Sequence, residues 1–228
     1  MADKLILPQN TRLMGVFLGF VGGSLDVFCH IQYHSLVATQ TGNILLLISD
    51  WHDSNVINTM LRFCSIIFFS LGFLFALHMK EYRKTAYWRV KMLLPLFIGT
   101  LILPFFSRFP LLEVSFIAFG TGMMMLTFTG SLIEDHPYVI FMTSGNYRKM
   151  LTALYRIARR EGNIQEYRRQ ALNYGIVVGS FIVGAISLAV LMHFLHEWSI
   201  WIVSLNLFLI MSYYIARVKQ LDLQDENI

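Results

Sequence analysis

Residues 13–49 read LMGVFLGFVGGSLDVFCHIQYHSLVATQTGNILLLIS, and this stretch decides the fold. The run from Leu13 to Tyr33 is apolar and long enough for a helix that crosses a bilayer, which needs about 20 residues. Asp26 lies inside this run, and a carboxylate at that depth is costly enough to be a candidate functional residue. The polar residues 39–43, Thr-Gln-Thr-Gly-Asn, then interrupt the apolar pattern before residues 44–48 resume it. This order predicts a membrane helix, a break and a short second helix.

The composition of the whole chain is that of an integral membrane protein. Of its 228 residues, 56% are hydrophobic and 14% are charged, whereas about a quarter of the residues in soluble domains are charged. The apolar runs are continuous and lack the period-two alternation of a membrane barrel. We therefore predict an all-α polytopic membrane protein, with about six transmembrane helices in a single membrane domain over residues 1–228.

Lysine and arginine are distributed unevenly among the connections between the predicted spans. The basic connections are residues 1–12, 80–91, 133–169 and 217–219, and the connections between them are residues 50–55, 107–110 and 193–197. Alternate connections are thus basic, as an even number of spans requires when both termini are cytoplasmic.

The second half of the chain repeats features of the first half in the same order. Gly23 precedes Thr41-Gly42-Asn43, and Gly122 precedes Ser144-Gly145-Asn146. Each Gly-Asn element is followed by a Phe-x-x-Gly sequence, which is Phe69-Ser70-Leu71-Gly72 in the first half and Phe181-Ile182-Val183-Gly184 in the second. With three spans in each half, residues 13–106 and 111–216 are expected to form two inverted three-helix repeats with short Gly-Asn helix breaks, an arrangement found in many transporters. The matches are short, so chance similarity is the alternative.

The two hydroxyl-Gly-Asn elements have the chemistry of helix breaks. Glycine permits a turn or a close helix contact, and Thr, Ser and Asn side chains can bond the backbone groups that a break leaves free. The N–H groups that begin the following half-helix favour an anion. Each element therefore either lines a substrate site or caps a helix at the membrane interface.

Asp26 and His30 lie four residues apart on one helix face, where they could share a proton or a hydrogen bond. Asp26 is either a proton or cation site or a structural acid bonded to another helix. No spacing indicates a metal site, a cofactor or an enzyme, because the HExxH, GxSxG and phosphate-loop patterns are absent. The candidate substrate or ion site comprises Asp26, His30, Thr41, Gly42, Asn43, Ser144, Gly145 and Asn146.

Residues 22–26, Gly-Gly-Ser-Leu-Asp, together with the two Gly-Asn elements and Gly122, resemble the YoaK-type family of small bacterial membrane proteins, a domain-of-unknown-function family. The resemblance covers most of the chain and implies about six helices in a bacterial cytoplasmic membrane. It implies no established activity. Members of that family often carry glutamine just after the second-half glycine, where this chain has Met123 and Met124.

These features favour a small secondary transporter or permease for a small polar solute. The alternative is a non-transporting membrane module that binds a partner protein or lipid through the basic residues 148–169. Membrane lipid is an expected partner in both cases, and nucleic acid in neither. A transporter should open a polar cavity to Asp26, whereas a binding module should bury Asp26 and expose its contact surface. Candidate oligomer contacts are the small-residue faces Gly15, Gly19 and Gly23, or Gly175 and Gly179.

Overall fold

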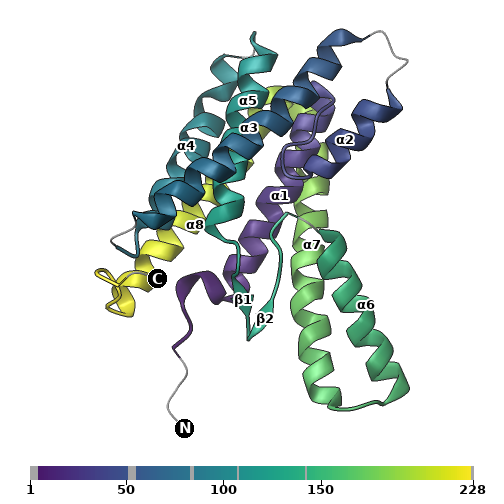
Figure 1. The fold of residues 1–228 in the computed structure, drawn as a ribbon, viewed down its shortest axis with the longest axis vertical. Helices are drawn as coiled ribbons and strands as arrows, with labels where there is room; N and C mark the ends of the chain where they lie inside the picture. Colours follow the sequence, from purple (N-terminus) through teal and green to yellow (C-terminus); the bar gives the residue numbers. More distant parts are fainter. Residues whose placement is uncertain (1–4, 51–54, 83–84, 107, 142, 227–228) are drawn as a thin grey trace.

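The computed structural model describes residues 5–50, 55–82, 85–106, 108–141 and 143–226, which form a bundle of long helices (Figure 1). In chain order the helices are α1 (Arg12–Tyr33), α2 (Gln40–Ser49), α3 (Val56–Glu81), α4 (Trp88–Ile102), α5 (Pro110–Thr127), α6 (Thr143–Arg159), α7 (Ile164–Leu195) and α8 (Trp201–Gln220). The short 3₁₀ turns are η1 (Pro8–Asn10), η2 (Leu103–Phe105) and η3 (His196–Ile200). Strand β1 (Leu132–Ile133) pairs antiparallel with β2 (His136–Pro137).

The lengths and the hydropathy of the helices confirm an all-α polytopic membrane protein. Five segments are long and apolar enough to cross a membrane, and the last of them, residues 164–220, contains both α7 and α8. The described residues therefore include six long apolar helices, which are α1, α3, α4, α5, α7 and α8. Helix α2 has only 10 residues, about 15 Å, which is half the thickness of the hydrocarbon core.

Helix α7 begins earlier than hydropathy indicates. The apolar run predicts a start near Ala171, but the helix begins at Ile164. The side chain of Asn163 accepts a hydrogen bond from the backbone N–H of Glu166 at 3.2 Å, so a local cap decides where the helix starts. With 32 residues, α7 is about 48 Å long and exceeds the thickness of the hydrocarbon core.

Helices α1 and α7 cross at backbone contact through glycine. A Cβ atom on Gly23 would lie 2.0 Å from the carbonyl oxygen of Phe181, and one on Gly184 would lie 2.2 Å from the carbonyl oxygen of Phe20. No side chain larger than hydrogen fits at either position, which is why these two helices can approach so closely.

Helices α3 and α5 make the same kind of crossing. A Cβ atom on Gly72 would lie 2.0 Å from the carbonyl oxygen of Phe119, and one on Gly122 would lie 2.1 Å from that of Phe69. In both crossings each glycine contacts the carbonyl of a phenylalanine that precedes the partner glycine by three residues. Figure 1 shows the pair α3 and α5 on one side of the bundle and the pair α1 and α7 on the other.

The small-residue face of α1 is used within the chain. Added Cβ atoms on Gly15 and Gly19 would meet Ile133, Val177 and Ser180 at 2.2–3.6 Å, and Gly23 meets α7 as described above. This face is therefore covered by α7 and the β1 strand and is not free for a second copy. Gly179 is different, because an added Cβ would have no heavy atom within 4 Å.

Replacing Gly23 by alanine should lower the free energy of unfolding by about 1–3 kcal/mol, the usual cost of an overpacked contact. The added methyl group would meet backbone atoms of α7, which cannot rotate away. Thermal melting of the purified protein in detergent measures the effect. Gly179→Ala is the matched control, because that position has open space. Equal melting temperatures for the two variants would contradict the packing described.

Candidate functional site

The chain breaks between α1 and α2 inside the apolar region. Helix α1 ends at Tyr33, and the next residue, His34, has the left-handed conformation with φ of 52°. Its backbone N–H bonds back to the carbonyl groups of Cys29 and His30, which closes the helix end. Residues 34–39 then cross to the start of α2, so their backbone groups lie outside any helix and need other partners.

Asp26 supplies hydrogen-bond partners for two of the backbone groups in the first break. Its Oδ1 atom accepts hydrogen bonds from the backbone N–H groups of Val37 at 3.0 Å and Ala38 at 2.7 Å. Its Oδ2 atom accepts a hydrogen bond from the hydroxyl of Thr39. The side chain is buried, with only 6% of the residue exposed. The carboxylate of Asp26, which belongs to α1, thus binds the turn that precedes α2.

Asn43 holds the same break from the other side. Its Oδ1 atom accepts a hydrogen bond from the backbone N–H of Leu36 at 2.8 Å, and its Nδ2 atom donates to the carbonyl of Leu36 at 2.6 Å. The side-chain amide therefore pairs with both backbone groups of one residue, as a neighbouring strand would. Asn43 is fully buried, so without these bonds its polar atoms would have no water as a substitute.

Asn146 makes the equivalent pair in the connection between β2 and α6, which is the second break. Its Oδ1 atom accepts a hydrogen bond from the backbone N–H of Val139 at 3.1 Å, and its Nδ2 atom donates to the carbonyl of Val139 at 2.7 Å. Asn146 is also fully buried. In both halves the asparagine pairs with the residue seven positions earlier. The two Gly-Asn elements of the sequence thus have one structural role, which is to close a break before a helix.

The first break is bound by a carboxylate, and the second break has methionine at the corresponding position. Asp26 stands three residues after Gly23, whereas Met125 stands three residues after Gly122. The second break therefore lacks the carboxylate that binds the first. Phe141, with φ of 66°, packs there against α1 instead, since an added Cβ on Gly22 would lie 2.5 Å from the Phe141 ring.

The other predicted site residues lie at the periphery of the breaks. Thr41 and Ser144 are exposed, and an added Cβ on Gly145 would meet nothing within 4 Å. Gly42 is needed for packing, because a Cβ there would lie 2.5 Å from the side chain of Leu36. His30 is exposed and lies edge-on to His34 at 6.5 Å between ring centroids. Within the described residues no hydrogen bond joins it to Asp26, so the predicted Asp26–His30 pair is wrong: the carboxylate is turned toward the break.

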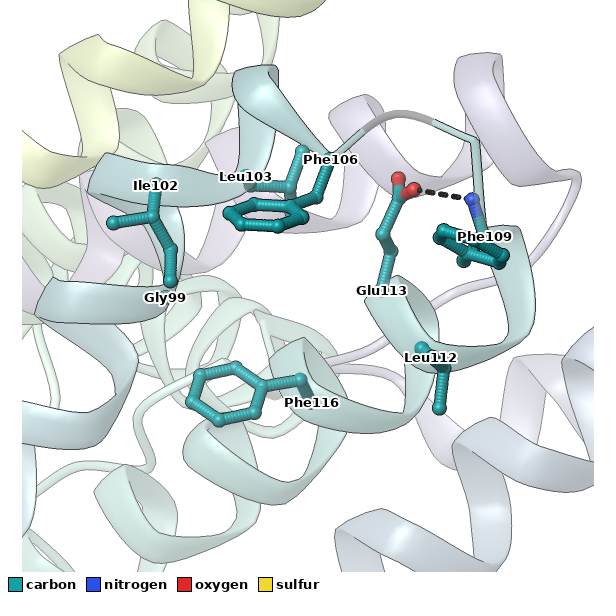
Figure 2. Close-up of a pocket in the computed structure, with 8 residues that line it drawn as sticks. All are labelled: Gly99, Ile102, Leu103, Phe106, Phe109, Leu112, Glu113 and Phe116. Atoms are coloured by element: carbon teal, nitrogen blue, oxygen red, sulfur yellow. Dashed lines mark hydrogen bonds between the residues drawn. The ribbon is translucent and has the colours of Figure 1, made fainter.

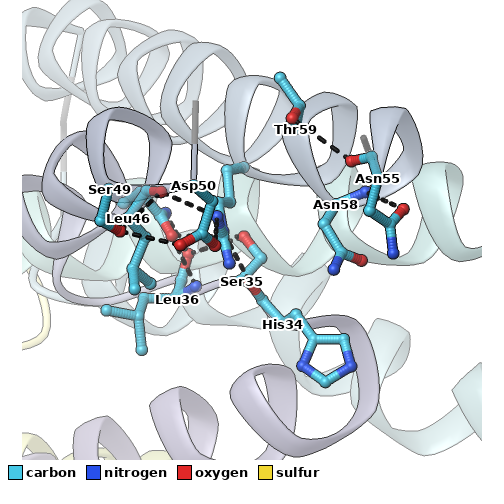
Figure 3. A network of polar contacts seen from close by, with 11 residues as sticks. His34, Ser35, Leu36, Leu46, Ser49, Asp50, Asn55, Asn58 and Thr59 are labelled. Carbon is cyan, nitrogen blue, oxygen red and sulfur yellow. Dashed lines mark hydrogen bonds and ion pairs between the residues drawn. The ribbon is translucent and has the colours of Figure 1, made fainter. Parts of the chain in front are cut away.

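Arg62, near the start of α3, holds the end of α2. Its Nε atom donates to the carbonyl of His34 at 2.8 Å, and its Nη1 atom donates to the carbonyl of Leu46 at 2.9 Å. The same Nη1 forms an ion pair with Asp50. Figure 3 shows His34, Leu46 and Asp50 converging at this point. The hydrogen bond from Arg62 lowers the pKa of Asp50 below its usual value, with a smaller contribution from Ser49.

A model of the family described as "Protein of unknown function (DUF1275)" matches residues 14–213. The chain belongs to this family. The match covers both breaks and all six long helices in whole or in large part. Membership agrees with the resemblance to a YoaK-type family and brings no activity with it. Neither the curated proteins nor the solved structures include a match to the chain.

Replacing either asparagine by alanine should destabilise the protein, because the backbone N–H and carbonyl at the break lose their partners. Asn43→Ala and Asn146→Ala should each lower the free energy of unfolding by about 1–3 kcal/mol. Ser144→Ala is the control and should change it by less than about 0.5 kcal/mol, since Ser144 is exposed. Thermal melting in detergent distinguishes these outcomes. A neutral Asn146→Ala would show that the second break does not need its amide pair.

The ion pair of Asp50 should make stability depend on pH. Because the pKa of Asp50 is lowered in the folded protein, its contribution is present above the ordinary value of 3.8 and is lost as the pH falls through the lowered value. Asp50→Asn should therefore lower the melting temperature at neutral pH, and the difference from the wild type should shrink below pH 3.8. Asp222→Asn, at an exposed position near the C-terminus, is the control. A difference that persists unchanged in acid would refute the pair.

Proposed function

We propose that the protein is a small secondary transporter for a small polar solute, built from two inverted repeats. The observation that carries this proposal is the equivalence of the two breaks, Asn43 with Leu36 and Asn146 with Val139, each pairing across seven residues. Discontinuous helices at corresponding places in two repeats are the feature from which many transporters build a midplane site.

The two glycine crossings support the same repeat. The first long helix of each proposed half, α1 or α5, packs against the second long helix of the other half, α7 or α3. The contact residues correspond in order: Phe20 and Gly23 in α1 with Phe119 and Gly122 in α5, and Phe69 and Gly72 in α3 with Phe181 and Gly184 in α7. Four matched glycine contacts make chance similarity a poor explanation of the sequence repeat. They also link the halves, so that a movement of one half relative to the other shifts both breaks.

Asp26 is proposed as the proton-sensitive group of this transporter. As a carboxylate it accepts three hydrogen bonds from residues 37–39, and charge-assisted bonds of this kind are stronger than neutral ones. Protonation would weaken all three and release the first break, which the asparagine pair alone would then hold. Only 6% of Asp26 is exposed, the burial expected above for a binding module, so in the transport proposal the buried acid corresponds to an occluded conformation.

The alternative function is a module that binds a partner protein or lipid through the hairpin of α6 and the start of α7. This hairpin carries seven of the basic residues against Glu161 and Glu166, a net charge of +5 where the whole chain has +4. Tyr147, Leu151 and Leu154 form an exposed apolar stripe on α6. Figure 1 shows α6 lying beside the first part of α7, away from the other helices. The basic residues are Arg148, Lys149, Arg156, Arg159, Arg160, Arg168 and Arg169.

Thiol labelling tests transport without knowledge of the solute. Thr41→Cys and Ser144→Cys place matched thiols at the two breaks, in a background where Cys29 and Cys64 are replaced by alanine. An impermeant maleimide is applied to right-side-out and to inverted membrane vesicles. A transporter should expose each thiol to both sides, in proportions that change with pH, because the breaks open alternately. Labelling of each thiol from one side only, at every pH, would refute transport and favour the binding module.

Asp26→Asn completes that experiment, because it keeps the shape of the side chain and removes its charge. If Asp26 controls the break, the labelling pattern of the variant should lose its pH dependence and resemble that of the wild type in acid. If Asp26 is only structural, the variant should melt at a lower temperature while its labelling keeps the pH dependence of the wild type. Thr39→Ala is the control that removes one donor and leaves the carboxylate.

A further inference from the structure

A second buried acid, Glu113, lines an apolar pocket that contains no residue of either break. The pocket lies between η2 and the start of α5 and has a volume of about 270 Å³. Its walls are apolar and include the rings of Phe106, Phe109 and Phe116 (Figure 2). Gly99 forms part of the opposite wall, where a Cβ atom would lie 2.1 Å from the Phe116 ring. The glycine therefore leaves the space that this ring occupies.

Glu113 is the one charged residue among those that line the pocket. Its Oε1 atom accepts a hydrogen bond from the backbone N–H of Phe109 at 3.1 Å, and its Oε2 atom accepts one from the hydroxyl of Tyr33. Figure 2 shows the carboxylate between Phe106 and Phe109. Only 7% of the residue is exposed. Both donors are neutral, and no lysine or arginine in the described part of the chain forms an ion pair with Glu113.

Glu113 therefore lacks the arginine partner that two other acids have in the described part of the chain. Asp50 is paired with Arg62, and Glu134 is paired with Arg12 at 2.9 Å. At Glu113 two neutral donors orient the carboxylate but do not compensate its charge, and an uncompensated charge at low dielectric is costly. Each carboxylate oxygen still has a lone pair for one more donor. A bound cation would supply both the missing charge and the missing donor.

We propose that this pocket binds a lipophilic ammonium ion, with its N–H donors on Glu113 and its apolar body among the three phenylalanine rings. Aromatic faces attract an organic cation as well as an apolar group, so the walls suit both ends of such a ligand. A cavity of about 150 Å³ holds benzene, so 270 Å³ suits an aromatic ring with a short alkylamine chain and is too small for a whole phospholipid. The residues that line the site lie between Gly99 and Phe116 and not in the two breaks, although Tyr33, which donates to Glu113, is the last residue of α1 before the first break.

Equilibrium binding of radiolabelled 2-phenylethylamine tests the proposal. The full chain is placed in nanodiscs of phosphatidylcholine and phosphatidylglycerol, neither of which carries a primary amine. The wild type should bind the amine saturably, and 2-phenylethanol, which has nearly the same shape without the charge, should compete at least about tenfold more weakly. Equal competition by the alcohol would overturn the proposal, because the pocket would then select only for apolar shape.

Two variants locate the binding at the pocket. Glu113→Gln should weaken amine binding by at least about tenfold, the loss expected when one charge-assisted hydrogen bond is removed. Glu161→Gln is the matched control, since Glu161 is exposed and bonds to Arg159 outside this pocket, and its binding should match the wild type within about twofold. Equal loss in both variants would show a general charge effect and overturn the assignment. If Glu113→Gln does not fold, Phe116→Leu replaces it and should weaken amine binding by removing one ring.

Nanodiscs that contain phosphatidylethanolamine separate a soluble amine from a lipid headgroup. The proposed ligand should bind with the same affinity in these nanodiscs, because a phospholipid does not fit the pocket. Displacement of 2-phenylethylamine in proportion to the phosphatidylethanolamine content would overturn the soluble ligand and assign the carboxylate to a lipid ammonium group.

Discussion

The pairing of a buried asparagine with the backbone of a residue seven positions earlier is the interaction on which this structure depends. A bilayer offers no water to backbone groups, so a chain that breaks a helix at membrane depth must satisfy the freed groups internally. Asn43 does this after the apolar helix α1, and Asn146 makes the same pair in the connection before α6, each with one donor and one acceptor directed at a single residue. Because the side-chain amide has both a donor and an acceptor, one asparagine can satisfy the N–H and the carbonyl of a residue that would otherwise need the backbone of a neighbouring strand.

The glycine crossings place these breaks in the bundle. Helix α1 contacts α7, and α5 contacts α3, through backbone atoms, so the helix axes cannot shift without breaking contact along the whole interface. Phe141 of the second break packs on Gly22, one turn before Asp26. The second break therefore lies against the same helix that carries the acid of the first. This proximity gives the two breaks a direct mechanical connection through α1.

The two buried acids show how surroundings assign different roles to similar groups. Asp26 receives three hydrogen bonds from its own chain, so its carboxylate is part of the fold and any change in its charge acts on the first break. Glu113 receives two and faces an apolar pocket. The first acid suits control of a conformation, and the second suits recognition of a cation from outside the chain.

The sequence by itself determined the membrane class, the long apolar helices and the presence of two polar Gly-Asn elements, because hydropathy and helix length are local properties of the chain. It placed the breaks at these elements, whereas in the structure Asn43 and Asn146 lie in the first turns of α2 and α6 and the breaks precede them. It also identified Asp26 as costly and the Gly-Asn elements as a short repeated pattern, with chance similarity as the alternative. Only the tertiary structure decided their partners: Asp26 binds residues 37–39 and not His30, and Tyr33 donates to Glu113 across 80 positions. The glycine face of α1 likewise binds α7 of the same chain. Such choices depend on how distant helices cross, and a periodicity of 3.6 residues states which side chains share a face but not what that face will meet.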